Sequence, residues 1–220
     1  MPTQLRSIVD HATAVRDIQD YFRVMDNGRP LYSGSRFETL GSEGDMDPNR
    51  ITATDLVAVS MLSVDVPAQA SVGILETHAE KIGGLLSEIP AGLKFEDLTA
   101  EEFDRHLTEG SPADKLWALL RQHEDPWEIG QTKASKIMAR KRPELIPVYD
   151  SVVKAVTGIK GSGEQWSVWY SAFHDGTSEA TEFVDKPRAI RAESGQPHLS
   201  LLRVLDIALW KQGKRENRLS

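Results

Sequence analysis

Apolar residues recur at helical spacing through almost the whole chain, and this spacing constrains the fold more than any other feature. In residues 3–25, and again in residues 200–211, they return every three or four positions, as in amphipathic helices. No segment shows the strict apolar–polar alternation of a half-buried strand over a useful length. A capping box at Thr99 and the Ser111-Pro112 pair predict two further helix starts. The sequence therefore predicts an all-α protein.

Length and composition are those of an ordinary globular protein. The chain has 220 residues, 40% of them hydrophobic and 27% charged, which suffices for one large domain or two small lobes around a substantial core. Residues 31–49 are rich in Gly, Ser, Asp and Pro. We interpret them as a loop with at most one short strand near residues 36–40. This loop is a candidate connection between lobes, and the alternative is a plain surface loop.

The absence of cysteine excludes several kinds of chemistry. With no cysteine in the sequence, there is no disulfide, no thiolate metal site and no cysteine nucleophile. The histidines are scattered without the i, i+4 spacing that places two imidazoles on one metal, so we predict no metal and no cofactor. No run of about 18 apolar residues is present, and the polar first residues lack the apolar core of a secretory signal. We therefore expect a cytoplasmic protein that does not insert into a membrane.

Residues 126–159 hold the most distinctive pattern of the chain. Gly130 opens a helical run with Ala134, Ile137 and Met138 on its apolar face. Two prolines end the run, and Asp150 then starts a second helix over residues 151–157. The remaining positions of the first helix are basic: Lys133, Lys136, Arg140, Lys141 and Arg142.

This basic strip permits two interpretations. The net charge of −7 argues against indiscriminate binding of nucleic acid. Residues 133–142, however, carry five positive charges and no negative one. A confined strip of this kind can hold one phosphate backbone, because distant acids are screened beyond about 8 Å at physiological salt. The alternative is an ordinary solvated helix face.

A row of aromatic residues follows the central stretch. Trp166, Trp169, Tyr170 and Phe173 fall on one side of a helix predicted over residues 164–174. Such a row can stack a nucleic-acid base, or it can form part of a hydrophobic core. The sequence leaves both interpretations open.

The central stretch resembles the helix-hairpin-helix DNA glycosylases. Gly130, Thr132 and Ala134, followed by residues 147–152 with Asp150 twenty residues after the glycine, are similar to that family's LPGVG-x-K-x-A and PVD-x-H-V segments. The resemblance implies that backbone N–H groups of the hairpin hold a phosphate. It also implies that Asp150 stabilises the positive charge that builds on the deoxyribose as a flipped base departs.

The resemblance further implies a lobe division and a type of enzyme. Members of the family are all-α with two lobes, which here gives a single domain with one lobe over residues 1–47 and 150–220 and the other over residues 48–149. The lysine nucleophile of bifunctional members falls at Thr132, and Lys133 lies about 100° further round the helix. We therefore expect a monofunctional glycosylase, a hydrolase that depends on Asp150 alone. Glu128 replaces the first hairpin glycine, and Val152 replaces the histidine.

The sequence thus predicts a protein that acts on DNA, by releasing a flipped base through one carboxylate. The alternative is a non-catalytic module for nucleic-acid or protein interaction on the same scaffold. The whole chain also resembles an uncharacterised actinobacterial protein family with Tyr-x-Gly-x-x-Phe and RKRPxLIPVYDSVV segments. The DNA-binding candidates are Gly130, Thr132, Lys133, Lys136, Arg140, Lys141 and Arg142, and the base-pocket candidates are Trp127, Tyr149, Trp166, Trp169 and Tyr170.

Overall fold

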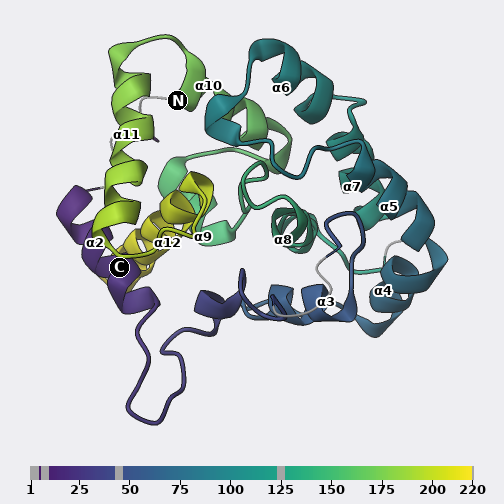
Figure 1. Cartoon of the computed structure of the whole chain (residues 1–220), viewed down its shortest axis with the longest axis horizontal. Helices are drawn as coiled ribbons and strands as arrows, with labels where there is room; N and C mark the ends of the chain where they lie inside the picture. Colours follow the sequence, from purple (N-terminus) through teal and green to yellow (C-terminus); the bar gives the residue numbers. More distant parts are fainter. Residues whose placement is uncertain (1–4, 6–9, 43–46, 123–126, 220) are drawn as a thin grey trace. The chain divides into compact units, whose positions relative to one another are not determined.

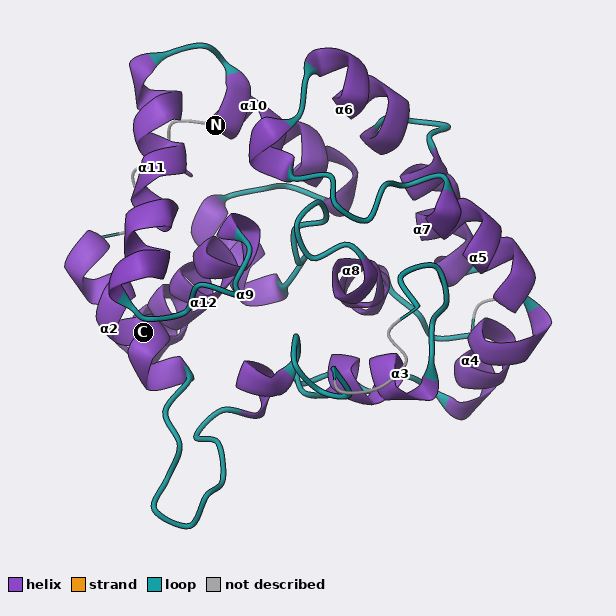
Figure 2. Cartoon of the chain, viewed as in Figure 1, coloured by secondary structure: helices purple, strands orange, loops and turns teal. Residues whose placement is uncertain are grey.

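The chain is helical, as Figures 1 and 2 show. The computed structural model describes residue 5 and residues 10–42, 47–122 and 127–219, and no strand occurs among them. The nearest approach to strand pairing there is one isolated bridge between Val24 and Pro30. The prediction of an all-α protein is therefore confirmed for the described residues.

The chain divides into two compact units. Unit 1 comprises Met1–Tyr32 and Pro147–Ser220, and unit 2 comprises Ser33–Ile146. The lobe division expected from the sequence placed residues 33–47 with the chain ends, whereas the structure groups them with unit 2. Hydrogen bonds from Arg140 to backbone carbonyl groups of residues 37–40 help to hold that segment in unit 2.

Unit 1 is built around its last helix. This helix, α12, buries nearly all of its first nine residues and packs against three of the other helices. Gly213 lets α9 approach α12 closely, because a Cβ atom there would lie 2.5 Å from a methyl group of Val152. The sequence predicted an end near residue 211, but the helix runs on to residue 219. The helices of unit 1 are α2 (His11–Tyr21), α9 (Ser151–Thr157), α10 (Gln165–His174), α11 (Ser178–Glu193) and α12 (Leu201–Leu219).

Unit 2 is organised around α8, which packs against α3 and α7. Every residue of α8 from position 134 onward is buried, including the charged ones. The helix starts predicted at Thr99 and Ser111 are confirmed, since both hydroxyl groups cap the helices that follow. The helices are α3 (Ala53–Ser60), α4 (Ala68–Val72), α5 (Ala79–Ser87), α6 (Ala100–Leu107), α7 (Pro112–Arg121) and α8 (Gln131–Lys141), with a π-helical turn over Gly73–Thr77 after α4.

Three local predictions differ from the structure. The helix expected over residues 3–25 lies partly outside the described residues, and its described part ends at Tyr21, where the chain turns into a loop. The prediction of at most one short strand near residues 36–40 is not matched by a strand. The backbone there forms a 3₁₀ turn over Ser33–Arg36 followed by further turns. A proline inside a helix usually breaks or kinks it, which predicts an interruption at Pro187, yet Pro187 lies within the continuous helix α11.

Candidate functional site

The hairpin that the sequence predicts is described at residues 127–130, which lead into the exposed N-terminus of α8. Gly130 is the N-cap residue of α8, and among the described residues no side chain caps this end. A Cβ atom at Gly130 would meet no described residue within 4 Å. Glu128 is exposed and has a φ of 64°, a left-handed conformation that glycine adopts most easily. Residue 128 thus has a backbone conformation that is more common for glycine than for glutamate.

Trp127 anchors this hairpin to the π-helical turn. Its indole ring lies against Gly73, where a Cβ atom would be 1.7 Å from a ring carbon. The indole N–H donates to the carbonyl oxygen of Leu120 at 2.6 Å, and the ring meets His78 edge to face. Trp127 was a base-pocket candidate. In the structure its ring instead packs against Gly73 and His78.

We expect Gly73→Ala to destabilise the protein by about 1–3 kcal/mol, because the added methyl group would overlap with the indole ring of Trp127 and displace it. Urea denaturation measures the effect. Gly84→Ala is the matched control, since Gly84 is also helical but has nothing within 4 Å of its Cβ position. That control should gain about 0.5–1 kcal/mol from helix propensity. Equal behaviour of the two variants would contradict the anchoring role.

The expectation that residues 133–142 present an exposed basic strip is corrected by the structure. Lys136, Arg140 and Lys141 are only 2%, 6% and 7% exposed. Lys136 donates to the carbonyl oxygen of Leu62 at 2.8 Å. Arg140 donates to three carbonyl groups of residues 37–40 and, through Nε, to Asp55 at 3.0 Å. Lys141 donates to the carbonyl oxygen of Asp47 and to the second oxygen of Asp55. These three side chains bind the protein's own acceptors.

Arg142 is buried in the same way, and no carboxylate among the described residues pairs with it. It is 1% exposed, and burial lowers its pKa. Its guanidinium group donates to the carbonyl oxygens of residues 48, 86, 89 and 141 and to the amide oxygen of Asn49. Arg142 therefore joins three separate stretches of unit 2. Of the basic strip, Lys133 is the residue that keeps a partly exposed side chain, at 22%, and its Nζ lies 3.9 Å from the exposed carboxylate of Asp65.

Asp55 is the buried anion of this cluster, and no sequence prediction named it. Burial acts to raise its pKa, but hydrogen bonds from the Thr52 backbone, Lys141 and Arg140 outweigh burial and lower the pKa. Asp55 also completes a capping box with Thr52 at the start of α3. The Thr-x-x-Asp spacing was a sequence signal for the cap, but nothing in the spacing indicated two cationic partners more than 80 residues away.

Asp150 lies in unit 1 and caps α9. Its Oδ1 accepts a hydrogen bond from the backbone N–H of Val152 at 2.9 Å, and the residue is half-buried. The helix predicted over residues 151–157 is confirmed. The cap places the carboxylate at the positive end of the helix dipole of α9.

The aromatic candidates in unit 1 are mostly part of its core. Trp169 is 1% exposed and stacks on Phe173, so its interpretation as a base-stacking residue is corrected. Tyr149 is 6% exposed. Trp166 and Tyr170 are half-buried, and Tyr170 stacks on His174 with ring centres 4.6 Å apart. These two keep the accessibility that base stacking requires.

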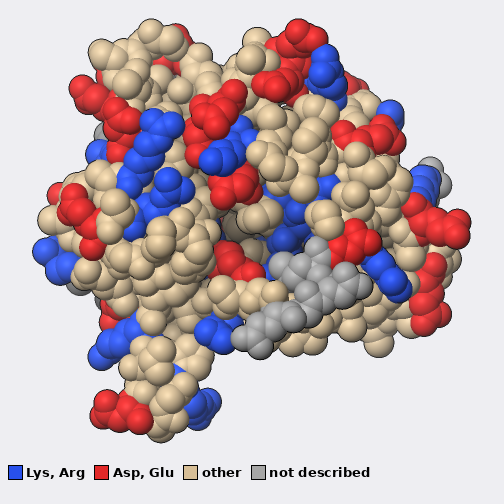
Figure 3. All heavy atoms as spheres, in the orientation of Figure 1, with Lys and Arg blue, Asp and Glu red and all other residues tan. Residues whose placement is uncertain are grey.

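Charge on the surface is mixed, and no metal cluster is found. On the face shown in Figure 3, acidic and basic side chains lie interspersed. Among the described residues, no group of three or more His, Asp or Glu side chains is arranged to hold a metal ion. Within the same residues, no helix has the length and apolar character needed to cross a bilayer.

Comparison with known proteins places the chain in a family. Residues 14–213 match a family of unknown function, DUF6308. The chain belongs to this family. The match agrees with the uncharacterised family expected from the sequence. No curated protein and no solved structure shows significant similarity to the chain.

Proposed function

We propose that this DUF6308 protein binds DNA through the hairpin between α7 and α8. The observation that carries the proposal is the left-handed backbone at Glu128, two residues before the uncapped start of α8 at Gly130. The first N–H groups of a helix have no intrahelical partner, and together with the helix dipole they favour a phosphate. Thr132 and Lys133, both half-buried in the first turn, are the side chains placed to assist. The buried residues Lys136, Arg140, Lys141 and Arg142 take no part.

Base release through Asp150 is the activity that we propose for this scaffold. A carboxylate can stabilise an oxocarbenium-like sugar while it orients a water molecule. Thr132 stands where a bifunctional enzyme would need an amine nucleophile, so the chemistry would be monofunctional. Trp166 and Tyr170 are the base-pocket candidates of unit 1 that are partly exposed, and we propose that they stack a flipped base.

A non-catalytic module is the second candidate. It is favoured by the hydrogen bond that Asp150 makes as the N-cap of α9, because this bond accounts for the carboxylate without any chemistry. In this alternative the hairpin binds DNA or a protein partner, and no base is released.

Asp150→Asn distinguishes the two candidates. Asparagine keeps the shape and caps helices as well as aspartate does, so folding and DNA affinity should change little. Base release from duplexes that carry single damaged or deaminated bases should fall by at least about a hundredfold if the carboxylate stabilises the transition state. Release that is unchanged in the variant, or absent from the wild-type protein, would favour the module. Covalent trapping of the wild-type protein on DNA by borohydride would contradict the monofunctional chemistry.

DNA binding itself is tested by fluorescence anisotropy over a range of salt concentrations. Lys133→Glu should weaken binding and reduce the salt slope by about one, because each phosphate contact releases about 0.9 counterion from duplex DNA. Lys115→Glu is the matched control, since Lys115 is an exposed lysine on α7. An equal loss in both variants would point to general charge attraction instead of the hairpin.

A further inference from the structure

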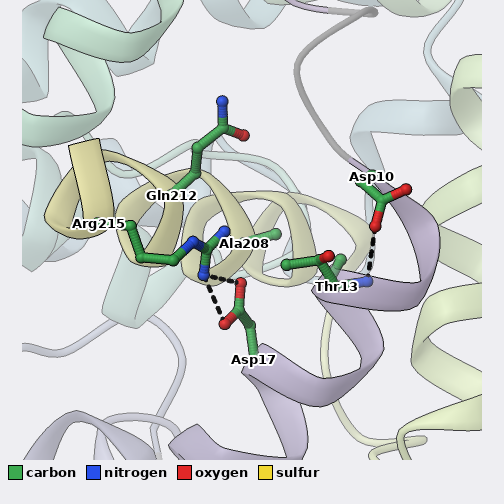
Figure 4. Close-up of a pocket in the computed structure, with 7 residues that line it drawn as sticks. Asp10, Thr13, Asp17, Ala208, Gln212 and Arg215 are labelled. Carbon is green, nitrogen blue, oxygen red and sulfur yellow. Dashed lines mark hydrogen bonds and ion pairs between the residues drawn. The ribbon is translucent and has the colours of Figure 1, made fainter. Parts of the chain in front are cut away.

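A pocket of about 300 Å³ lies between α2 and α12 of unit 1, and Figure 4 shows its lining. On α2 the lining residues follow helical spacing, so they share one face that looks toward α12. The small side chains Ala14 and Ala208 are 2% and 3% exposed and leave room where larger ones would fill the space. The polar lining residues are Asp10, Thr13, Asp17, Gln212 and Arg215.

Charge in this pocket is unevenly balanced. The Nη1 group of Arg215 donates to both carboxylate oxygens of Asp17, at 2.7 and 2.6 Å, so these two charges compensate each other. Asp10 precedes Asp17 by about two helical turns. Its Oδ2 accepts a hydrogen bond from the backbone N–H of Thr13 at 2.9 Å. Hydrogen bonds from the side chain and the backbone of Thr13 lower the pKa of Asp10, with a smaller contribution from the charge of Arg16. Among the lining residues that the structure describes, none supplies a positive charge to Asp10, because Arg215 is paired with Asp17.

Asp10 is the lining residue whose chemistry selects a ligand. The amide nitrogen of Gln212 donates to Glu216 at 2.9 Å. The hydroxyl oxygen of Thr13 accepts from Arg16 at 3.2 Å. A primary ammonium group brings three N–H donors and one positive charge, and so it complements the carboxylate of Asp10.

We propose that the pocket binds a small aliphatic amine, with its ammonium group at Asp10 and its alkyl part over Ala14 and Ala208. The volume is at the lower end of the range for ligand pockets, so the pocket has room for a small amine. An amino acid fits less well, because its carboxylate needs a strong donor and Arg215 is already paired with Asp17. This site is separate from the hairpin and does not depend on the function proposed above.

Backbone-amide NMR of the full chain tests the proposal, with n-butylammonium and putrescine as probes and n-butanol and butyrate as uncharged and anionic controls. The two amines should give saturable shifts in residues 10–17 and 208–215, and the controls should not. Asp10→Asn keeps the helix cap and should weaken amine binding by at least about tenfold. Asp114→Asn, which also removes an acid beside a helix start but lies in unit 2, should leave binding unchanged.

Two outcomes would overturn the proposal. One is the absence of saturable shifts at these residues with either amine up to high millimolar concentration. The other is equal amine binding by the wild-type protein and by Asp10→Asn, or equal binding of n-butanol, because either result would show that the charge of Asp10 does not select the ligand.

Discussion

Asp55→Asn is expected to lower the free energy of unfolding by about 3–5 kcal/mol, which is typical of removing one partner from a buried ion pair. The side chain of Asp55 is 4% exposed and lies 3.0 Å from both Arg140 and Lys141. Asparagine has the same shape but no charge. Its amide nitrogen is a donor that would face two cations, so both would remain buried without a counter-ion. Chemical denaturation followed by circular dichroism measures the loss.

Glu102→Gln is the matched control for this prediction. Glu102 completes the capping box of α6 through the same hydrogen bonds to its threonine, but it is half-buried and contacts no buried cation. Glutamine also serves in capping boxes, so this variant should lose less than about 1 kcal/mol. If the two variants lose similar amounts, the cap and not the ion pair explains the role of Asp55.

The same pair predicts a pH dependence. The pKa of Asp55 is lower in the folded protein than its ordinary value, so the unfolded chain binds more protons in the interval between the two pKa values. The stability that Asp55 contributes is complete above its unfolded pKa of about 3.9 and is lost as the pH falls through the folded pKa. The difference between wild-type protein and Asp55→Asn should therefore shrink below about pH 4. A difference that stays constant down to pH 2 or so would contradict this assignment.

Local sequence signals predicted the helices well because their causes are local. Thr99 and Ser111 cap α6 and α7 as the sequence indicated, and Asp150 caps α9. These contacts join residues two or three positions apart, so spacing alone reveals them. The length of α12 was underestimated because its last turns are polar, and polar residues give no apolar period to extend.

The burial of the basic strip could not be predicted from spacing. The acceptors of Arg140 lie about 100 residues away in a loop, and a loop rich in Gly, Ser and Asp gives no sign of which of its carbonyl groups lack partners. Apolar periodicity assigned Ala134, Ile137 and Met138 to the buried face of α8 and therefore assigned the cations to solvent. The long arginine and lysine side chains instead donate to backbone carbonyl groups of unit 2.

The candidate sites also combine local features, which residue spacing can reveal, with contacts between distant residues, which it cannot. The turn chemistry at Gly130 and Glu128 is local, and the structure has an open helix start at that point. The position of Trp127 depends on Gly73, more than 50 residues earlier, where only glycine leaves room for an indole ring. The pocket between α2 and α12 joins residues almost 200 positions apart and left no pattern in either helix that spacing could detect.

Arg142→Met is expected to cost more than about 4 kcal/mol, because several buried acceptors would lose their partner at once. The guanidinium group of Arg142 bonds to five oxygen atoms, and the residue is 1% exposed, so water has no ready access to replace these bonds. Typical domains have only about 5–15 kcal/mol of stability in total, so this variant should be largely unfolded at 37 °C or so.

Arg142→Lys makes the same prediction measurable if the methionine variant cannot be purified. Lysine keeps the positive charge but has three donors on one nitrogen, so it cannot reach residues 48, 86 and 89 together. We expect a loss of about 2–3 kcal/mol and faster hydrogen exchange in residues 47–49 and 86–89, which Arg142 joins. Arg105→Met is the control, because the Arg105 side chain is 60% exposed and pairs with the exposed Glu101, where a loss of at most about 1 kcal/mol is expected. If Arg142→Lys is as stable as this control, burial of the guanidinium group is not what holds these stretches of unit 2 together.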